Sequence, residues 1–186
     1  MSATVAPGST VPGGRGQAMP LSLYEASVLV FLRGFHVLGT LLDRAEAHAA
    51  ARGMDPAALI GARLAPDMYT LAGQVQCASD AAKLCAARLA GVERPSFADT
   101  EASFPELRER IARTVAFLEG LDPAAIEAGA ARTVALRLGG AERQVTGSEY
   151  LLQVALPNFF FHLTTAYGIL RHNGVVLRKA DYLGVA

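Results

Sequence analysis

The chain has 186 residues, of which 52% are apolar, so it is long enough to bury a core as one domain. Seventeen basic residues balance seventeen acidic ones, and the net charge of zero gives no hint of nucleic acid or an anionic membrane as a partner. We therefore expect neither nucleic acid nor a membrane as a partner. Alanine, the strongest helix former, is abundant and favours an all-α protein.

The two cysteines, Cys77 and Cys85, indicate a reducing compartment. They lie on one predicted helix at a spacing that separates their Cα atoms by about 12 Å, which is beyond the reach of a disulfide. No apolar run approaches the roughly 20 residues of a membrane span, and the N-terminus lacks the apolar segment of a signal peptide. We therefore predict a cytoplasmic protein.

The N-terminal residues are rich in Gly, Pro, Ser and Thr and show no periodicity. We predict a disordered extension over 1–20 and a folded domain over 21–186. Ser22 and Glu25 form a capping box, in which each side chain binds the backbone N–H of the other residue at a helix start. Apolar residues then recur every three or four positions, which predicts a long helix to about Ala51.

A short helix and a second long helix are predicted next. The Asp-Pro pair at 55–56 is typical of an N-cap followed by the first helical turn, and it predicts a short helix over 56–61. A Pro-Asp pair at 66–67 gives another start signal, from which the apolar period continues to about Ala90. Gln74 lies beside the apolar seam of this helix, where polar residues are uncommon.

A connector, a third long helix and a hairpin follow. Residues 91–103 contain a proline and no helical period, and a capping box at 103–106 then starts a helix that ends at Gly120. Apolar and polar residues alternate over 133–145, and Gly139-Gly140 can reverse the chain, so we predict a β-hairpin. A lone hairpin is marginal in water, and we expect this one to lie across the end of the bundle.

The last long helix is predicted over 146–174. Thr146 and Glu149 form a capping box at its start, and Asn173-Gly174 favours the left-handed backbone that ends a helix. Its residues are apolar on nearly every side, so we expect it to be the innermost helix. The predicted fold is therefore all-α, a four-helix bundle with a small β-hairpin before the last helix.

Pro157 lies inside this last helix, where it cannot donate to the carbonyl of Gln153 and typically costs about 3 kcal/mol. We expect a kink beside Asn158, which forms a polar pair with His162 in an apolar neighbourhood. Two interpretations of this pair stay open. The side chains can hydrogen-bond as an i, i+4 pair that fixes helix register, or they can line a pocket in which His162 acts as acid, base or sole imidazole ligand.

Three separated motifs carry a resemblance to a known family. They are S-L-Y-E-A-S-V near the start, R-L-A-P-D-M-Y in the middle and L-P-N-F-F-F-H-L-T-T-A-Y-G-I-L-R-H-N-G in the last helix. Together with the hairpin and the T-G-S-E start of the last helix, they resemble the DinB-like (YfiT-like) superfamily and, within it, a bacterial family of unknown function. The resemblance covers about residues 20–184.

The resemblance implies a four-helix bundle that often forms homodimers. In many members a divalent metal is held by one histidine of the second helix and an H-x-x-x-H pair of the fourth. His162 matches the second histidine of that pair, Asn158 stands at the first, and Gln74 is the candidate for the second-helix ligand. Asp67 could compensate only if the helices bring it near. A carboxamide oxygen is a poor ligand for Zn²⁺, so the resemblance implies a degenerate site that binds Zn²⁺, Ni²⁺ or Mn²⁺ weakly or not at all.

Two functions from different classes follow from these observations. The first is a non-catalytic, homodimeric helical-bundle protein that has lost the metal of the superfamily. The second is a divergent metal-dependent transferase or hydrolase that acts on a small molecule or a thiol conjugate. Stoichiometric metal that is lost on His162→Ala would favour the enzyme, and a metal-free protein would favour the first function.

Overall fold

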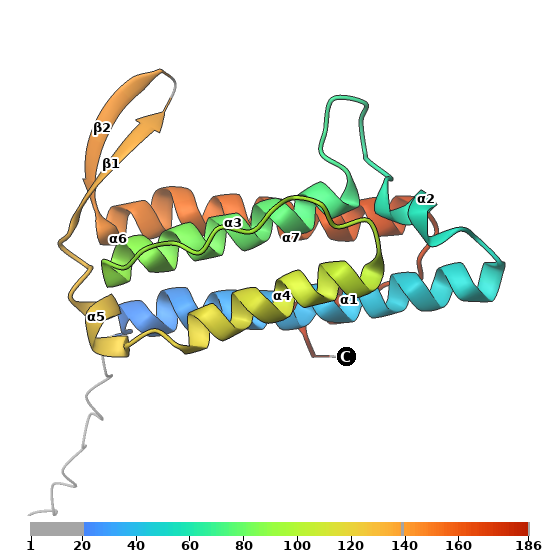
Figure 1. Cartoon of the computed structure of the whole chain (residues 1–186), viewed down its shortest axis with the longest axis horizontal. Coiled ribbons are helices and arrows are strands. Elements are labelled where there is room, and N and C mark those ends of the chain that lie inside the picture. The colour runs from blue at the N-terminus through green and yellow to red at the C-terminus, as the bar shows by residue number, and fades with distance from the viewer. Residues whose placement is uncertain (1–20, 139, 186) are drawn as a thin grey trace, which may run out of the picture.

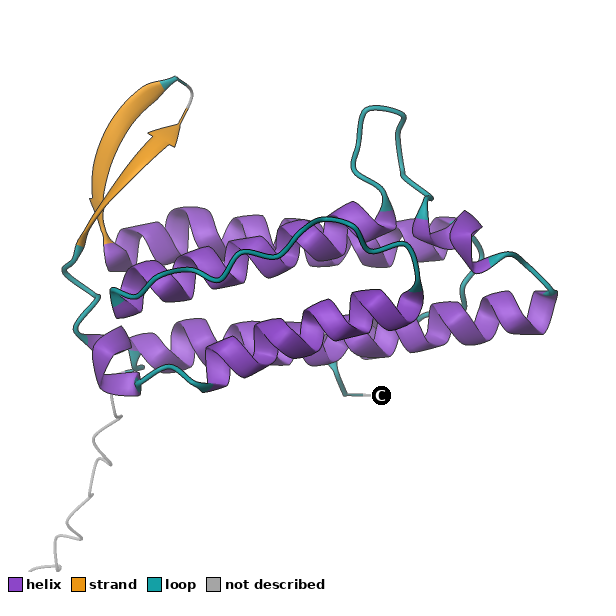
Figure 2. Cartoon of the chain, viewed as in Figure 1, coloured by secondary structure: helices purple, strands orange, loops and turns teal. Residues whose placement is uncertain are grey.

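The structure, a computed structural model, describes residues 21–138 and 140–185. The extension predicted over 1–20 lies outside the described residues. Within them, long helices pack into a bundle with one β-hairpin at its end (Figure 1), and helices dominate the fold (Figure 2). This confirms the predicted all-α bundle with a small β-hairpin before the last long helix. In chain order the elements are a π-helical turn (Glu25–Leu29), α1 (Val30–Arg52), α2 (Pro56–Ile60), α3 (Leu71–Ala90), α4 (Phe104–Glu119), α5 (Pro123–Glu127), β1 (Thr133–Leu138), β2 (Ala141–Thr146), α6 (Gly147–Tyr150), a second π-helical turn (Leu151–Ala155), α7 (Leu156–His172) and α8 (Lys179–Leu183).

The order of the helices requires one long crossover. α3 and α4 run in the same direction, because residues 91–103 carry the chain back along the length of the bundle before α4 begins (Figure 1). We call residues 91–103 the strap. α1 and α7 run parallel to each other and opposite to α3 and α4 (Figure 1). The strap is thus the long connection that distinguishes this bundle from a simple up-and-down one.

The capping boxes predicted at the start of the first and the last long helix are present. The backbone N–H of Ser22 donates to Glu25 Oε2 at 3.0 Å, and the backbone N–H of Glu25 donates to Ser22 Oγ at 3.0 Å. Thr146 and Glu149 make the same two bonds at 2.8 and 3.2 Å. These bonds satisfy backbone N–H groups that have no partner inside the helix, which explains why helices begin where predicted.

The second long helix begins later than predicted. Residues 63–70 form an irregular loop, and α3 starts at Leu71 with Thr70 as its N-cap, whose hydroxyl accepts from Gly73 N–H at 3.2 Å. The Leu71 N–H is also bound, by the carbonyl of Ala62 at 2.8 Å. The Pro-Asp signal at 66–67 therefore does not start this helix, because the cap at Thr70, three residues after Asp67, is fixed by the loop that precedes it.

The helix predicted over 146–174 is formed by α6, the second π-helical turn and α7, and we refer to this stretch as the last helix. It continues through Pro157 by changing its hydrogen-bond pattern. The π-helical turn over Leu151–Ala155 comes just before the proline, and the Leu156 N–H donates to the carbonyl of Leu151, five residues back. Pro157 then occupies the first turn of α7, where a missing N–H is tolerated. A wider turn thus absorbs the proline, and helical structure extends from Gly147 to His172.

One side of the last helix is central to the core. Phe159 is fully buried, and its ring centroid lies 5.0 Å from that of Phe31 and 5.3 Å from that of Phe35 on α1. The opposite side is not covered, since Leu152 is 62% exposed and Phe161 is 56% exposed. The prediction that this helix would be the innermost is therefore wrong. Its apolar outer side lacks a cover among the described residues.

The hairpin stands at the end of the bundle (Figure 1). Its strands pair in the antiparallel register Thr133 with Thr146. Val134 and Leu136 of β1 are buried, whereas β2 is largely exposed. The hairpin is thus held to the helices by one face of one strand.

One helical stretch, Glu25–Arg52, is long and apolar enough to cross a membrane by length and composition alone. It is also a core helix of the bundle, because Phe31, Phe35 and Leu38 on it are buried against the other helices. An apolar stripe of this kind is expected of a helix that packs in a bundle.

Candidate functional site

The candidate site residues on the second and fourth long helices meet. His162 Nδ1 on α7 lies 2.8 Å from Gln74 Oε1 on α3, and both side chains are buried, with 8% and 1% of their surfaces exposed. Gln74 Nε2 donates to the carbonyl of Tyr69 at 3.1 Å, at the end of the loop that precedes α3. The helices therefore bring together two of the residues singled out from the sequence.

This geometry determines which ring nitrogen of His162 carries the proton. The amide nitrogen of Gln74 donates to Tyr69, so the amide oxygen faces the imidazole and can only accept. Nδ1 must then carry the proton, and Nε2 keeps its lone pair. Burial also lowers the pKa of His162 from its usual 6.5, which favours a neutral ring.

The buried His162 predicts a pH dependence of stability. Because the pKa of the folded imidazole is lowered, the unfolded chain binds a proton at this position more readily. The contribution of His162 to the free energy of unfolding should therefore be largest above about pH 6.5 and should decrease as the pH drops through the pKa of the folded state. In urea denaturation between about pH 7.5 and about pH 5.5, His162→Gln should lose less stability than the wild type. An equal loss in both proteins would show that His162 is not the source.

The other two candidate residues lie elsewhere. Asn158 is exposed, and among the described residues His162 hydrogen-bonds to Gln74 and not to Asn158. Asp67 is exposed in the loop before α3. No group of three or more His, Cys, Asp or Glu side chains within the described ranges is arranged to hold a metal ion. Metal binding by Gln74, Asn158, His162 and Asp67 stays a prediction.

Asn158 instead lines a separate cleft of ≈ 240 Å³. The cleft lies between α3, β1 and the start of the last helix, and its polar lining also includes Arg88, Arg137 and Tyr150. The guanidinium carbon of Arg88 lies 5.0 Å from the ring centroid of Tyr150. α3 is far in the sequence from the other two segments that form the cleft, so no single motif indicates it.

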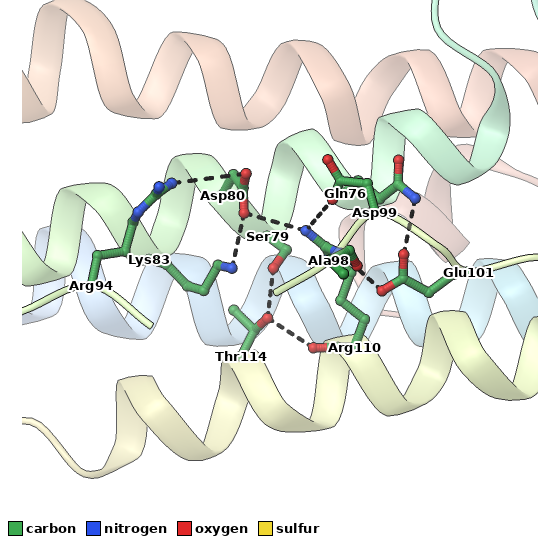
Figure 3. Close-up of polar contacts among 10 residues, drawn as sticks. All are labelled: Gln76, Ser79, Asp80, Lys83, Arg94, Ala98, Asp99, Glu101, Arg110 and Thr114. Carbon is green, nitrogen blue, oxygen red and sulfur yellow. Dashed lines mark hydrogen bonds and ion pairs between the residues drawn. The ribbon is translucent and has the colours of Figure 1, made fainter. Parts of the chain in front are cut away.

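The largest buried charged group of the bundle lies under the strap (Figure 3). Arg110 on α4 is completely buried, and its guanidinium binds Glu101 and Asp99 of the strap at 2.8 Å each. It also donates to the strap carbonyl of Ala98 at 3.1 Å and lies 3.3 Å from Asp80 on α3. Arg110 therefore ties the strap to both helices that it crosses.

Lys83 is a second buried cation in this cluster. Its ammonium nitrogen lies 2.9 Å from Asp80 Oδ1 and 3.7 Å from the ring centroid of Phe97 in the strap. Burial lowers the pKa of Lys83, although the ion pair with Asp80 opposes this shift. Carboxylates of the strap and of α3 already pair with the cations of the cluster, so the cluster fastens the strap to the helices and is not an open site.

The charged cluster was not identified from the sequence, although a signal existed. Arg110 lies three residues after Leu107 on the apolar seam of its helix, and Lys83 directly follows the seam residue Ala82. A charged residue at such a position must find a partner when the helix is buried. The pattern could therefore have marked both cations, but not their partners in the strap.

Known proteins resemble the chain over nearly its whole length. The family model described as a domain of unknown function (DUF1993) matches residues 23–183. A crystal structure of a DinB family member protein from Shewanella denitrificans is 42% identical, covers 88% of this chain and 93% of its own, and superposes with a TM-score of 0.81. No curated protein matches the sequence. The chain therefore belongs to the DUF1993 family, a DinB-like family of unknown function.

Proposed function

We propose that this protein is a non-catalytic, homodimeric DinB-like bundle in which a neutral hydrogen-bonded pair takes the place of a metal site. The observation that carries the proposal is the 2.8 Å contact between His162 Nδ1 and Gln74 Oε1. It commits the protonated nitrogen of the imidazole to a neutral partner on the second long helix. The pair joins α3 to α7 and thereby fixes their register.

The chemistry of the donor set does not fit a tight metal site. Zn²⁺ in proteins is held by three or four imidazole, thiolate or carboxylate ligands. Here one imidazole is available, Gln74 is a neutral carboxamide already in use, and Asn158 lines a different cleft. Asp67, the one carboxylate candidate, is exposed in the loop before α3. Both cysteines are free, which agrees with the cytoplasmic location that we propose.

Metal analysis of protein purified without a histidine tag tests this proposal. We expect much less than one equivalent of Zn²⁺, Ni²⁺ or Mn²⁺ per chain, and no increase in thermal stability when each ion is added, because a ligand that binds only the folded state would raise it. His162→Ala and Gln74→Ala should leave the metal content unchanged. About one metal per chain that His162→Ala removes would overturn the proposal.

The proposed homodimer rests on the uncovered side of the last helix. Leu152, Phe160 and Phe161 are 62%, 37% and 56% exposed there, which is unusual for large apolar side chains of one helix. A second copy of the chain offers the same apolar side, so the two can cover each other across a two-fold axis.

The double variant Leu152→Glu/Phe161→Glu is expected to convert the dimer to a monomer, because it buries unpaired carboxylates in the proposed interface. Light scattering after gel filtration would measure the mass. Val176→Glu is a matched control, since Val176 is 73% exposed but lies outside the last helix. A wild type with the mass of one chain, or a double variant that remains dimeric, would contradict the proposed interface.

A second candidate is a divergent metal-dependent transferase or hydrolase that acts on a small molecule or thiol conjugate. One observation favours it, namely that the hydrogen bond to Gln74 orients His162 and leaves the Nε2 lone pair without a partner among the described residues. An imidazole that binds a metal through one ring nitrogen commonly donates a hydrogen bond of this kind from the other. The metal analysis above separates the two functions.

A further inference from the structure

We propose that the cleft lined by Arg88 and Asn158 binds a small carboxylate that carries an apolar group. This inference is independent of the metal and of the dimer, because the lining of the cleft includes neither the pair His162 and Gln74 nor the apolar side chains of the proposed interface. The cleft has a volume of ≈ 240 Å³, below the roughly 300 Å³ at which pockets for drug-sized molecules begin. Its occupant must therefore be small.

The charge of the cleft selects an anion. Arg88 and Arg137 line it, no Asp or Glu belongs to its lining, and neither arginine forms an ion pair with the described residues. Arg110, by contrast, contacts Asp80, Asp99 and Glu101. Glu142 lies opposite Arg137 across the hairpin, so Arg88 supplies the positive charge of the cleft that has no acidic partner among the described residues.

The remaining lining indicates the kind of anion. The walls include Leu84 and Val154, which favour an apolar body, and the ring of Tyr150 lies beside Arg88. Asn158 contributes an amide that can donate a hydrogen bond. A carboxylate matches the planar fork of a guanidinium with two parallel bonds, and its apolar group can lie against the walls. A small aromatic or branched aliphatic carboxylate fits both requirements.

Titration of nitrogen-15-labelled protein with benzoate tests the proposal directly. We expect saturable shifts of the backbone amide signals of Tyr150, Asn158 and Arg88 with benzoate. Benzamide, which has the same shape without the charge, should bind at least about tenfold more weakly. Inorganic phosphate should not saturate the same signals, because it has no apolar group. Absence of saturable benzoate binding, or equal affinity for benzamide, would overturn the proposal, and so would tighter binding of phosphate.

Variants identify the groups that hold the anion. Arg88→Met keeps an unbranched, flexible side chain and removes the guanidinium with its charge, and we expect it to weaken benzoate binding at least about tenfold. Asn158→Asp places a negative charge in the cleft at an exposed position, so the fold should be retained while binding is lost. Arg143→Met is the control, because Arg143 lies on the hairpin that carries Arg137 but does not line the cleft. Unchanged affinity in both Arg88→Met and Asn158→Asp would overturn the assignment.

Discussion

Replacing Arg110 with methionine is expected to lower the free energy of unfolding by about 3 kcal/mol, because within the described residues it removes the only cation that contacts both Asp99 and Glu101 of the strap. The loss should lie at the lower end for a broken buried ion pair. Asp80 and Asp99 are 41% and 59% exposed, so water can solvate them, whereas Glu101 is only 10% exposed. The melting temperature should fall by roughly 10 °C.

Hydrogen exchange would locate this loss in the protein. Backbone amides of the strap, residues 91–103, should exchange faster in Arg110→Met, while those in the middle of α3 and α7 stay protected under native conditions. The result would show that the strap opens as a unit once its central contact is gone. A loss of stability below about 1 kcal/mol, with unchanged hydrogen exchange of the strap amides, would contradict the role of Arg110 as the residue that holds the strap on the helices.

Lys83→Met is the matched contrast, because it removes the other buried cation of the same cluster. Burial lowers the pKa of Lys83, which means that its surroundings disfavour the charged form. Asp80 also keeps Arg94 and Arg110 as partners. We therefore expect Lys83→Met to leave the stability unchanged or to raise it, since an apolar isostere avoids the cost of a buried charge. A loss as large as that of Arg110→Met would show that the two cations act alike.

Gly34→Ala is expected to destabilise the protein by about 2 kcal/mol through a collision in the core. Gly34 lies in α1 against the last helix, and a Cβ atom added to it would lie 2.6 Å from Cζ of Phe159. The Phe159 ring cannot move aside easily, because it is fully buried between Phe31 and Phe35. Overpacking of this kind forces strained rotamers or a shift of the helices.

Gly39→Ala in the same helix provides the control. A Cβ atom at Gly39 meets nothing within 4 Å, so only the backbone preference of alanine remains. We expect a gain of about 0.5–1 kcal/mol, because glycine in a helix interior is less favourable than alanine. Urea denaturation of both variants would measure the two effects. Equal changes in both would contradict the close packing of α1 against Phe159.

Local signals in the sequence predicted the helices and the hairpin well. Capping boxes at Ser22 and Thr146 and the apolar periods between them depend on neighbours a few residues apart, and such neighbours are visible in the sequence. The start of α3 was misplaced because Thr70, and not Asp67, is fixed by the preceding loop. The outer side of the last helix was misjudged because an apolar surface does not reveal whether its cover lies in the same chain.

The site was predictable only where the family pattern applied. The contact between Gln74 and His162 joins residues 88 positions apart, and the resemblance to DinB-like proteins placed both on facing helices. The strap cluster and the Arg88 cleft depend on tertiary contacts among several segments. Periodicity carries no information about which side chains of distant segments contact each other, so neither the strap cluster nor the cleft could be predicted from the sequence.

Nitrogen-15 NMR of the His162 ring tests most directly whether this imidazole is a structural group or a metal ligand. We predict a protonated Nδ1 bonded to Gln74, an unprotonated Nε2, and no change in either signal when one equivalent of Zn²⁺ is added. A large shift of Nε2 with Zn²⁺, lost in the presence of a chelator, would contradict the proposed metal-free pair.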